Sequence, residues 1–124
     1  SCFFTLKKFD KNKNIFVTSD ETFLGPVVAF CGIANEILFR LETKKRFNNI
    51  KYFKIFKDHY NYQLKDFENL KLNLSKFNSS TIVTTKKDFY KIQSSFHDFT
   101  VFIIDVEHLI NNSDQLIKTL KLYC

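Results

Sequence analysis

The chain has 124 residues, of which 44% are apolar and 26% are charged, and this is the range of one globular domain with a single core. Its net charge of +6 could attract nucleic acid or an anionic membrane, but the excess of 19 Lys and Arg over 13 Asp and Glu forms no dense block and favours ordinary solvated lysines. No apolar stretch approaches the roughly 18 residues that span a bilayer, and the first ten residues lack the anatomy of a secretion signal.

The first part of the chain, residues 1–24, is predicted to be a strand segment and a connector. Residues 2–9 have a strand-like composition, and the polar run at 10–14 (DKNKN) predicts a turn before a second short apolar run at 15–17 (IFV). Loop composition continues to Gly25-Pro26. We therefore expect an N-terminal strand or hairpin.

A strand and a helix are predicted next. Residues 27–31 (VVAFC) form a continuous apolar run, which is typical of a strand buried on both faces. Gly32 ends this strand, and Asn35 can cap a helix that runs to about Phe47. We expect the buried face of that helix to contain Ile37, Leu38 and Leu41.

The alternation of strand and helix continues. Residues 50–56 predict a strand, although their polar and apolar positions alternate less regularly. The following helix, over residues 64–77, has the clearest pattern in the chain, because its apolar positions recur at intervals of three and four. These positions are Leu64, Phe67, Leu70, Leu74 and Phe77.

The last third of the chain repeats the same pattern. Residues 81–84 (TIVT) are a β-branched strand, and Thr85 and Asp88 fit a capping box in which each satisfies a backbone donor of the other at the start of a short helix. Residues 101–106 predict another buried strand. Ser113 can cap a final helix, whose inward positions are Leu116, Ile117 and Leu120.

Strands that alternate with helices imply parallel pairing and right-handed crossovers. The expected fold is therefore α/β, a small sandwich of about four parallel strands with flanking helices over residues 25–124, preceded by the N-terminal strand or hairpin. Bound groups in such sheets lie beyond the carboxyl ends of the strands. Three unusual groups of residues fall at these ends.

The first group is residues 29–35 (AFCGIAN), where Gly32 allows a sharp turn and the helix start leaves backbone donors free for an anion. On local evidence an ordinary strand-to-helix turn is the favoured interpretation. The group is not a phosphate loop, because the glycine-rich loop with its Lys and Ser or Thr is missing from the whole sequence.

The second group is residues 56–62 (FKDHYNY), which places His59 after Asp58 in a polar loop with aromatic neighbours. A histidine there can relay a proton or orient a carboxylate. Chemistry alone favours a surface histidine, because no nucleophile is in view. His97 and His108 have no patterned partner and are predicted to be surface residues.

The third group is residues 83–88 (VTTKKD). A capped helix after a strand explains Thr85 and Asp88. A functional interpretation would have Lys86 or Lys87 reaching a phosphate, and their position supports this weakly.

The cysteines stand at positions 2, 31 and 124, and an odd number at such wide spacing predicts neither a disulfide framework nor a metal site. Cys31 lies in an apolar run and is interpreted as a small core residue. A reducing compartment fits this pattern best.

The three groups, in this order and at this spacing, resemble the carboxyl-terminal part of the lipid A 4'-kinases, the tetraacyldisaccharide 4'-kinase family. That family carries Ala-Phe-Ala/Cys-Gly-Ile-Gly/Ala-Asn, later Phe-x-Asp-His-x-x-Tyr/Phe, and then Val-Thr-Thr-Glu-Lys-Asp. No single motif is decisive, but three in series are specific. There are three departures: Glu36 replaces the family's Pro, Lys86 replaces its Glu, and Gln63 replaces the usual Ser or Thr helix cap.

The resemblance implies transfer of the γ-phosphate of ATP to the 4'-hydroxyl of a tetraacylated disaccharide 1-phosphate, at the cytoplasmic face of the inner membrane in lipid A synthesis. The family's phosphate loop, magnesium-binding acids and catalytic Asp lie in an amino-terminal P-loop domain, which we expect to be absent here. ATP and Mg²⁺ are therefore expected to bind mainly to that missing half, and no residue of this chain is assigned to them. The resemblance carries one role over to this chain, the supporting histidine at His59, with Asp58 as its orienting neighbour.

By itself the chain is therefore expected to be inactive. Its implied partners are the nucleotide-binding half, in cis or as a separate chain, the lipid A precursor disaccharide, and a membrane surface. Two alternatives stay open, a basic binding module for nucleic acid or an anionic membrane, and a folded remnant without activity. No base-reading motif is present, so any nucleic-acid binding should be independent of sequence.

Overall fold

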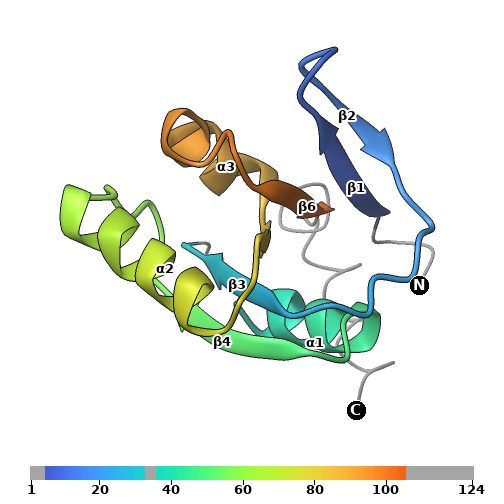
Figure 1. The fold of residues 1–124 in the computed structure, drawn as a ribbon, viewed down its shortest axis with the longest axis horizontal. Coiled ribbons are helices and arrows are strands. Elements are labelled where there is room, and N and C mark those ends of the chain that lie inside the picture. Colours follow the sequence, from blue (N-terminus) through green and yellow to red (C-terminus); the bar gives the residue numbers. More distant parts are fainter. Residues whose placement is uncertain (1–4, 33–35, 106–124) are drawn as a thin grey trace, which may run out of the picture.

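A computed structural model describes residues 5–32 and 36–105 of the chain. Its strands form one six-stranded sheet in the order β2-β1-β6-β5-β3-β4 (Figure 1). Parallel pairing joins the last four of these strands, which are β3 (Val27–Cys31), β4 (Ile50–Ile55), β5 (Thr81–Thr84) and β6 (Thr100–Asp105). The predicted α/β fold with about four parallel strands is confirmed.

The N-terminal hairpin is also confirmed. It consists of β1 (Thr5–Asp10) and β2 (Ile15–Thr18), and β1 pairs antiparallel with both β2 and β6. The turn between them is closed by Asp10, whose Oδ1 accepts the backbone N–H groups of Asn12 at 3.0 Å and Lys13 at 3.3 Å. Asn14 has a left-handed φ of 56°, which asparagine adopts more readily than most residues.

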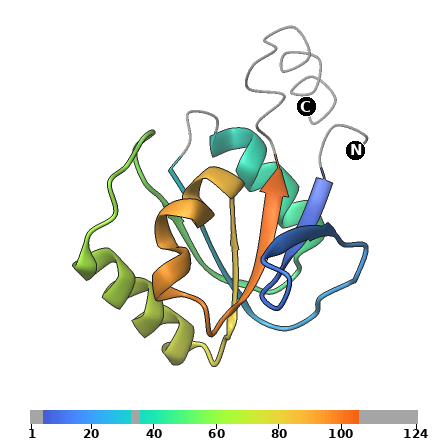
Figure 2. The same ribbon diagram turned by 90° about the horizontal axis from the view of Figure 1, so that it is seen from above.

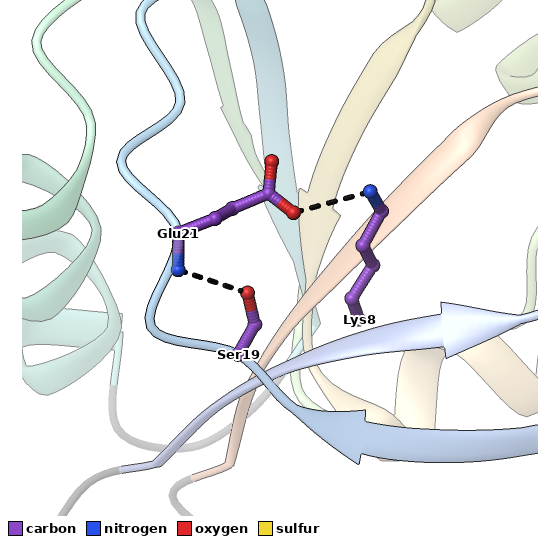
Figure 3. Close-up of polar contacts among 3 residues, drawn as sticks. All are labelled: Lys8, Ser19 and Glu21. Carbon is purple, nitrogen blue, oxygen red and sulfur yellow. Dashed lines mark hydrogen bonds and ion pairs between the residues drawn. The ribbon is translucent and has the colours of Figure 1, made fainter.

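The connector between β2 and β3 is tied back to β1 (Figure 3). Ser19 N–H donates to the Leu6 carbonyl at 2.8 Å, and Glu21 N–H donates to Ser19 Oγ at 3.3 Å. Figure 3 shows the Lys8 and Glu21 side chains pointing toward each other, and their Nζ and Oε1 atoms are 3.1 Å apart. The division of the chain at residue 24 stays a prediction.

Helices cover both faces of the sheet. On one face, α1 (Glu36–Arg46) packs Leu38 and Phe39 into a core cluster with residues of β1, β3, β5 and β6. On the other face, α2 (Leu64–Lys76) and α3 (Lys86–Ile92) form a second cluster, which continues into the 3₁₀ turn η1 (Gln93–Ser95) and Phe96. Figure 1 shows α1 and α3 on opposite sides of β3, and Figure 2 shows the same helices from above. The central strand β3 is buried at all five positions, as its composition predicts.

The buried face of α1 differs from the predicted one. Leu38 is buried as expected, but Ile37 is 57% exposed, and the buried positions continue through Phe39, Glu42 and Thr43. The helix is rotated because Phe39 packs edge-on against Phe53 of β4, with ring centroids 5.6 Å apart. Glu42 stays paired in the core, because Arg46 NH2 lies 2.7 Å from its Oε1.

The predicted helix over 64–77 is observed as α2, which buries Leu70 and Leu74. Leu64 was expected on the same face but is 72% exposed, because it is the first residue of the helix and lies beyond the edge of the core. The predicted cap at Asn35, the surface position of His108 and the final helix after Ser113 lie outside the described residues.

The order of the parallel strands creates a switch point between β3 and β5. The chain leaves β3 through α1 to reach β4 on one side, and then returns through α2 to β5 on the other side of β3. The loops after β3 and β5 therefore run in opposite directions, and in open α/β sheets this is where ligands bind.

Candidate functional site

The three groups of residues singled out in the sequence meet at this switch point. The Asp88 side chain, which is only 1% exposed, accepts Gly32 N–H at 3.2 Å on Oδ1 and 3.1 Å on Oδ2. The Tyr62 hydroxyl donates to Oδ1 at 2.9 Å, and the Thr85 hydroxyl donates to Oδ2. One carboxylate thus joins the loop after β3, the loop before α2 and the start of α3.

Half of the predicted capping box is confirmed. Thr85 is the N-cap of α3, and its Oγ1 accepts Asp88 N–H at 3.2 Å. The Asp88 carboxylate does not return a bond to the Thr85 backbone, because it turns to Gly32, Tyr62 and the Thr85 hydroxyl instead. Sequence reasoning missed this arrangement, since Gly32 precedes Asp88 by 56 residues and no local pattern signals the contact.

Gly32 is suited to this crowded turn because it has no side chain. A Cβ at this position would stand 3.0 Å from the Lys57 carbonyl oxygen and 3.3 Å from Asp88 Oδ1. The first contact is with backbone, which cannot move aside without shifting the second loop. Glycine is therefore favoured at position 32 because the backbone of the second loop comes so close, and not because Gly32 has an unusual φ.

Tyr62 and Tyr60 anchor the end of the second loop. Burial raises the pKa of the Tyr62 phenol, and the adjacent Asp88 carboxylate raises it further, so the hydroxyl keeps its proton and donates. The Tyr60 hydroxyl donates to Asp66 Oδ2 at 2.8 Å, and this hydrogen bond raises the pKa of Tyr60. The same oxygen accepts Gln63 N–H at 2.8 Å, so Asp66 satisfies a backbone donor at the start of α2, where Gln63 stands in place of the usual Ser or Thr.

His59 lies at the rim of this assembly. Its side chain is 74% exposed, and its Nε2 is 3.5 Å from Asp58 Oδ2. Lys87 Nζ lies 3.3 Å from Nδ1 of the ring. An ammonium group only donates, so a hydrogen bond from Lys87 would need Nδ1 to be the accepting nitrogen of the ring. His59 has a left-handed φ of 59°, which is uncommon for residues other than glycine, although histidine adopts it more readily than most.

The two lysines of the third group have different surroundings. Lys86 Nζ lies over the Phe16 ring of the hairpin, 5.5 Å from its centroid, whereas Lys87 contacts His59. Lys91, one helical turn after Lys87, donates to the Tyr60 carbonyl at 3.0 Å. No sequence motif marks Lys91, although its spacing of four residues from Lys87 places both lysines on one face of the helix.

His97 is a surface residue, as predicted. Its side chain is 73% exposed, and its Nε2 is 3.5 Å from Asp98 Oδ1. It precedes β6 and therefore lies at the amino end of the parallel strands, opposite to His59. Cys31 is fully buried in β3, as its apolar neighbours predict.

Comparison with known proteins places this arrangement in a family. The family model described as tetraacyldisaccharide-1-P 4'-kinase matches residues 5–123. The chain belongs to this family. A tetraacyldisaccharide 4'-kinase of Rickettsia bellii (strain OSU 85-389) is 43% identical over 107 residues, which cover 86% of this chain and 29% of that protein. One of Rickettsia canadensis (strain McKiel) is 39% identical over 113 residues, which cover 90% of this chain and 30% of that protein.

The chain thus spans about three tenths of the length of these relatives and corresponds to their C-terminal part. No solved structure matches it. The family resemblance rests on residues that the structure brings into contact, since Gly32, Tyr62, Thr85 and Asp88 each belong to one of the three motifs.

The described part of this tetraacyldisaccharide-1-P 4'-kinase family member does not fit a nucleotide with magnesium. The Asp88 carboxylate already accepts the Gly32 N–H at the switch point, and its negative charge would repel a phosphate there. Across residues 5–32 and 36–105, no three His, Cys, Asp or Glu side chains are grouped to hold a metal ion. Within the same ranges, no helix is long and apolar enough to cross a membrane.

Proposed function

We propose that this chain supplies the C-terminal part of a kinase that transfers the γ-phosphate of ATP to the 4'-hydroxyl of tetraacyldisaccharide 1-phosphate in lipid A synthesis. Family membership supports the reaction. The exposed His59, at the sheet edge where the three motifs meet, is the observation on which the role of this part depends. Residues 25–124 form the C-terminal α/β domain in this proposal, and residues 1–24 are its N-terminal strand segment and connector.

The proposed part of His59 is to assist removal of the proton from the accepting hydroxyl, by supporting a catalytic carboxylate of the nucleotide-binding half. An exposed imidazole can meet such a group when the two halves close over the substrate. Asp58 lies beside Nε2 of the ring and Lys87 beside Nδ1, so both contacts can orient the imidazole. Phosphoryl transfer depends mainly on positioning and charge stabilisation, so a part without phosphate-binding groups can still complete the site.

ATP and Mg²⁺ belong to the nucleotide-binding half in this proposal, because the described residues do not fit them. The other partners are that half itself and the lipid A precursor disaccharide. The work is proposed to take place at the cytoplasmic face of the inner membrane, where the lipid substrate is found.

The test combines this chain with the amino-terminal part of the Rickettsia bellii relative that it does not cover, and measures phosphorylation of the disaccharide 1-phosphate. His59→Ala should lower kcat by about 10²- to 10⁴-fold and leave KM for ATP nearly unchanged. His97→Ala is the matched control, since His97 is 73% exposed and has the same 3.5 Å approach to a neighbouring Asp, at the other edge of the sheet. It should leave kcat unchanged.

Equal kcat values for His59→Ala and His97→Ala would remove His59 from the reaction. Turnover by the 124-residue chain alone, with ATP and magnesium, would contradict the division of labour between the two halves. Failure of the combined halves to turn over, when the intact Rickettsia bellii protein does, would favour the interpretation as an inactive remnant.

A further inference from the structure

The three motif loops are joined by a carboxylate that itself lies away from the exposed histidine. We infer that Asp88 is a positioning residue, which holds the loop bearing Asp58 and His59 in its working conformation by binding the Tyr62 hydroxyl and the Gly32 amide. This inference rests on the proposed function, because it assigns Asp88 a role in the same site.

The loop that carries His59 is fixed at both ends. At its start, Phe56 is buried and its N–H donates to the Cys31 carbonyl at 2.8 Å, which continues the β3–β4 pairing. At its end, Tyr62 donates to Asp88 and packs against Phe56 and Phe30, with ring centroids 5.0 and 6.1 Å away. Asp88 therefore provides the polar anchor at the second end.

The segment between these anchors is a tight turn. Tyr60 N–H donates to the Lys57 carbonyl at 3.0 Å, and His59 stands inside the turn with a φ of 59°. A left-handed backbone is uncommon for residues other than glycine, although histidine adopts it more readily than most, and it persists where the surroundings hold it. Loss of the Tyr62 anchor would allow the turn to open and His59 to return to an ordinary φ.

Asp88 is difficult to replace in this position. Its side chain is buried, and within the described residues it forms no ion pair, so neutral donors from Gly32, Tyr62 and Thr85 stabilise the carboxylate. Each donor comes from a different loop, and removing the single acceptor would release all three. Lys87, which contacts His59, directly precedes Asp88 on α3, so the anchor also sets where that ammonium lies.

The test compares Asp88→Ala, Asp88→Asn and Tyr62→Phe with Leu74→Ala in the 124-residue chain. Leu74 is 1% exposed on α2 and has no polar side-chain group, so its truncation lowers stability without removing a hydrogen bond of the anchor. Amide hydrogen exchange is followed for Tyr60, whose N–H closes the turn, under conditions where every variant is folded. Asp88→Ala and Tyr62→Phe should accelerate this exchange about tenfold, and Leu74→Ala should not.

Asp88→Asn provides the conservative rescue. The amide keeps one oxygen for Gly32 and Tyr62 and can donate toward Thr85, so exchange at Tyr60 should stay within about threefold of the wild type. If Asp88→Ala does not fold, Tyr62→Phe carries the comparison, since it removes one hydroxyl only. Equal exchange at Tyr60 in Tyr62→Phe and Leu74→Ala would overturn the inference.

A kinetic measurement separates positioning from mere stability. In the combined-halves assay, Tyr62→Phe should lower kcat by about 10-fold or more with KM for ATP unchanged, whereas Leu74→Ala should leave both constants unchanged. Equal kcat for the two variants would overturn the positioning role even where the kinase reaction is observed. A wild-type assay without turnover would contradict the proposed function, while the exchange measurements would still decide whether Asp88 holds the loop.

Discussion

Replacing Tyr62 by Phe removes one hydroxyl from the switch point and leaves the aromatic packing in place. The lost hydrogen bond is the 2.9 Å contact with Asp88 Oδ1, inside a site where the carboxylate is 1% exposed. Hydrogen bonds to charged groups contribute about 1.5–3 kcal/mol. Gly32 and Thr85 still donate hydrogen bonds to the carboxylate after the change, so it is not left without partners. We therefore expect the free energy of unfolding to fall by about 2 kcal/mol at pH 7.

The same variant makes a prediction about pH. Burial and the Asp88 charge raise the pKa of Tyr62 in the folded protein above its ordinary value of about 10. The folded state then holds a proton that the unfolded state releases, so the stability that Tyr62 contributes is complete below about pH 10 and is lost as the pH rises above it. The difference in free energy of unfolding between the wild type and Tyr62→Phe should therefore be about 1.4 kcal/mol smaller at pH 11 than at pH 7.

The assay is urea unfolding of both proteins at pH 7 and pH 11, with the slope m compared to confirm that the same surface is exposed. Tyr90→Phe is the matched control, because Tyr90 is 57% exposed. Removing its hydroxyl should change the free energy of unfolding by nearly zero at both pH values. A difference below about 0.5 kcal/mol for Tyr62→Phe at pH 7 would refute the reasoning about the Asp88 contact. A difference of about 2 kcal/mol that stays constant to about pH 11 would show that folding does not raise the pKa of Tyr62.

Three further substitutions test the surrounding structure, and thermal or urea unfolding measures each of them. Gly32→Ala should lower stability by about 1–3 kcal/mol, because its Cβ would press on the Lys57 carbonyl 3.0 Å away; a neutral result would mean that the loop moves freely. Phe30→Ala should cost about 3–5 kcal/mol, since Phe30 is fully buried in the central strand; a loss under about 1 kcal/mol would contradict that packing. His59→Gly should leave stability unchanged or raise it by up to about 1 kcal/mol, because glycine relieves the left-handed φ of 59°; a marked loss would identify His59 as a structural residue.

The secondary structure of the described residues could be predicted from sequence because its signals are local. The apolar run at 27–31 is β3 (Val27–Cys31), and the helix expected over 64–77 is α2 (Leu64–Lys76). Both patterns depend only on neighbours within a few turns. The facing of residues near helix ends could not be predicted in the same way: Ile37 and Leu64 fit an apolar face but are exposed, because packing against distant strands sets where the core stops.

The candidate site shows the same division. The sequence by itself was sufficient to pick out the three motifs, their position after strands and the Asp58–His59 pair, because motif order and the strand–helix alternation are properties of the chain. Only the tertiary structure decided that Lys87 rather than Lys86 reaches His59. It also decided that the Asp88 carboxylate accepts the N–H of Gly32 instead of the N–H of its own helix cap, Thr85. The physical reason is that a buried carboxylate takes the donors that the strand order brings to it, and those donors come from loops far apart in the sequence.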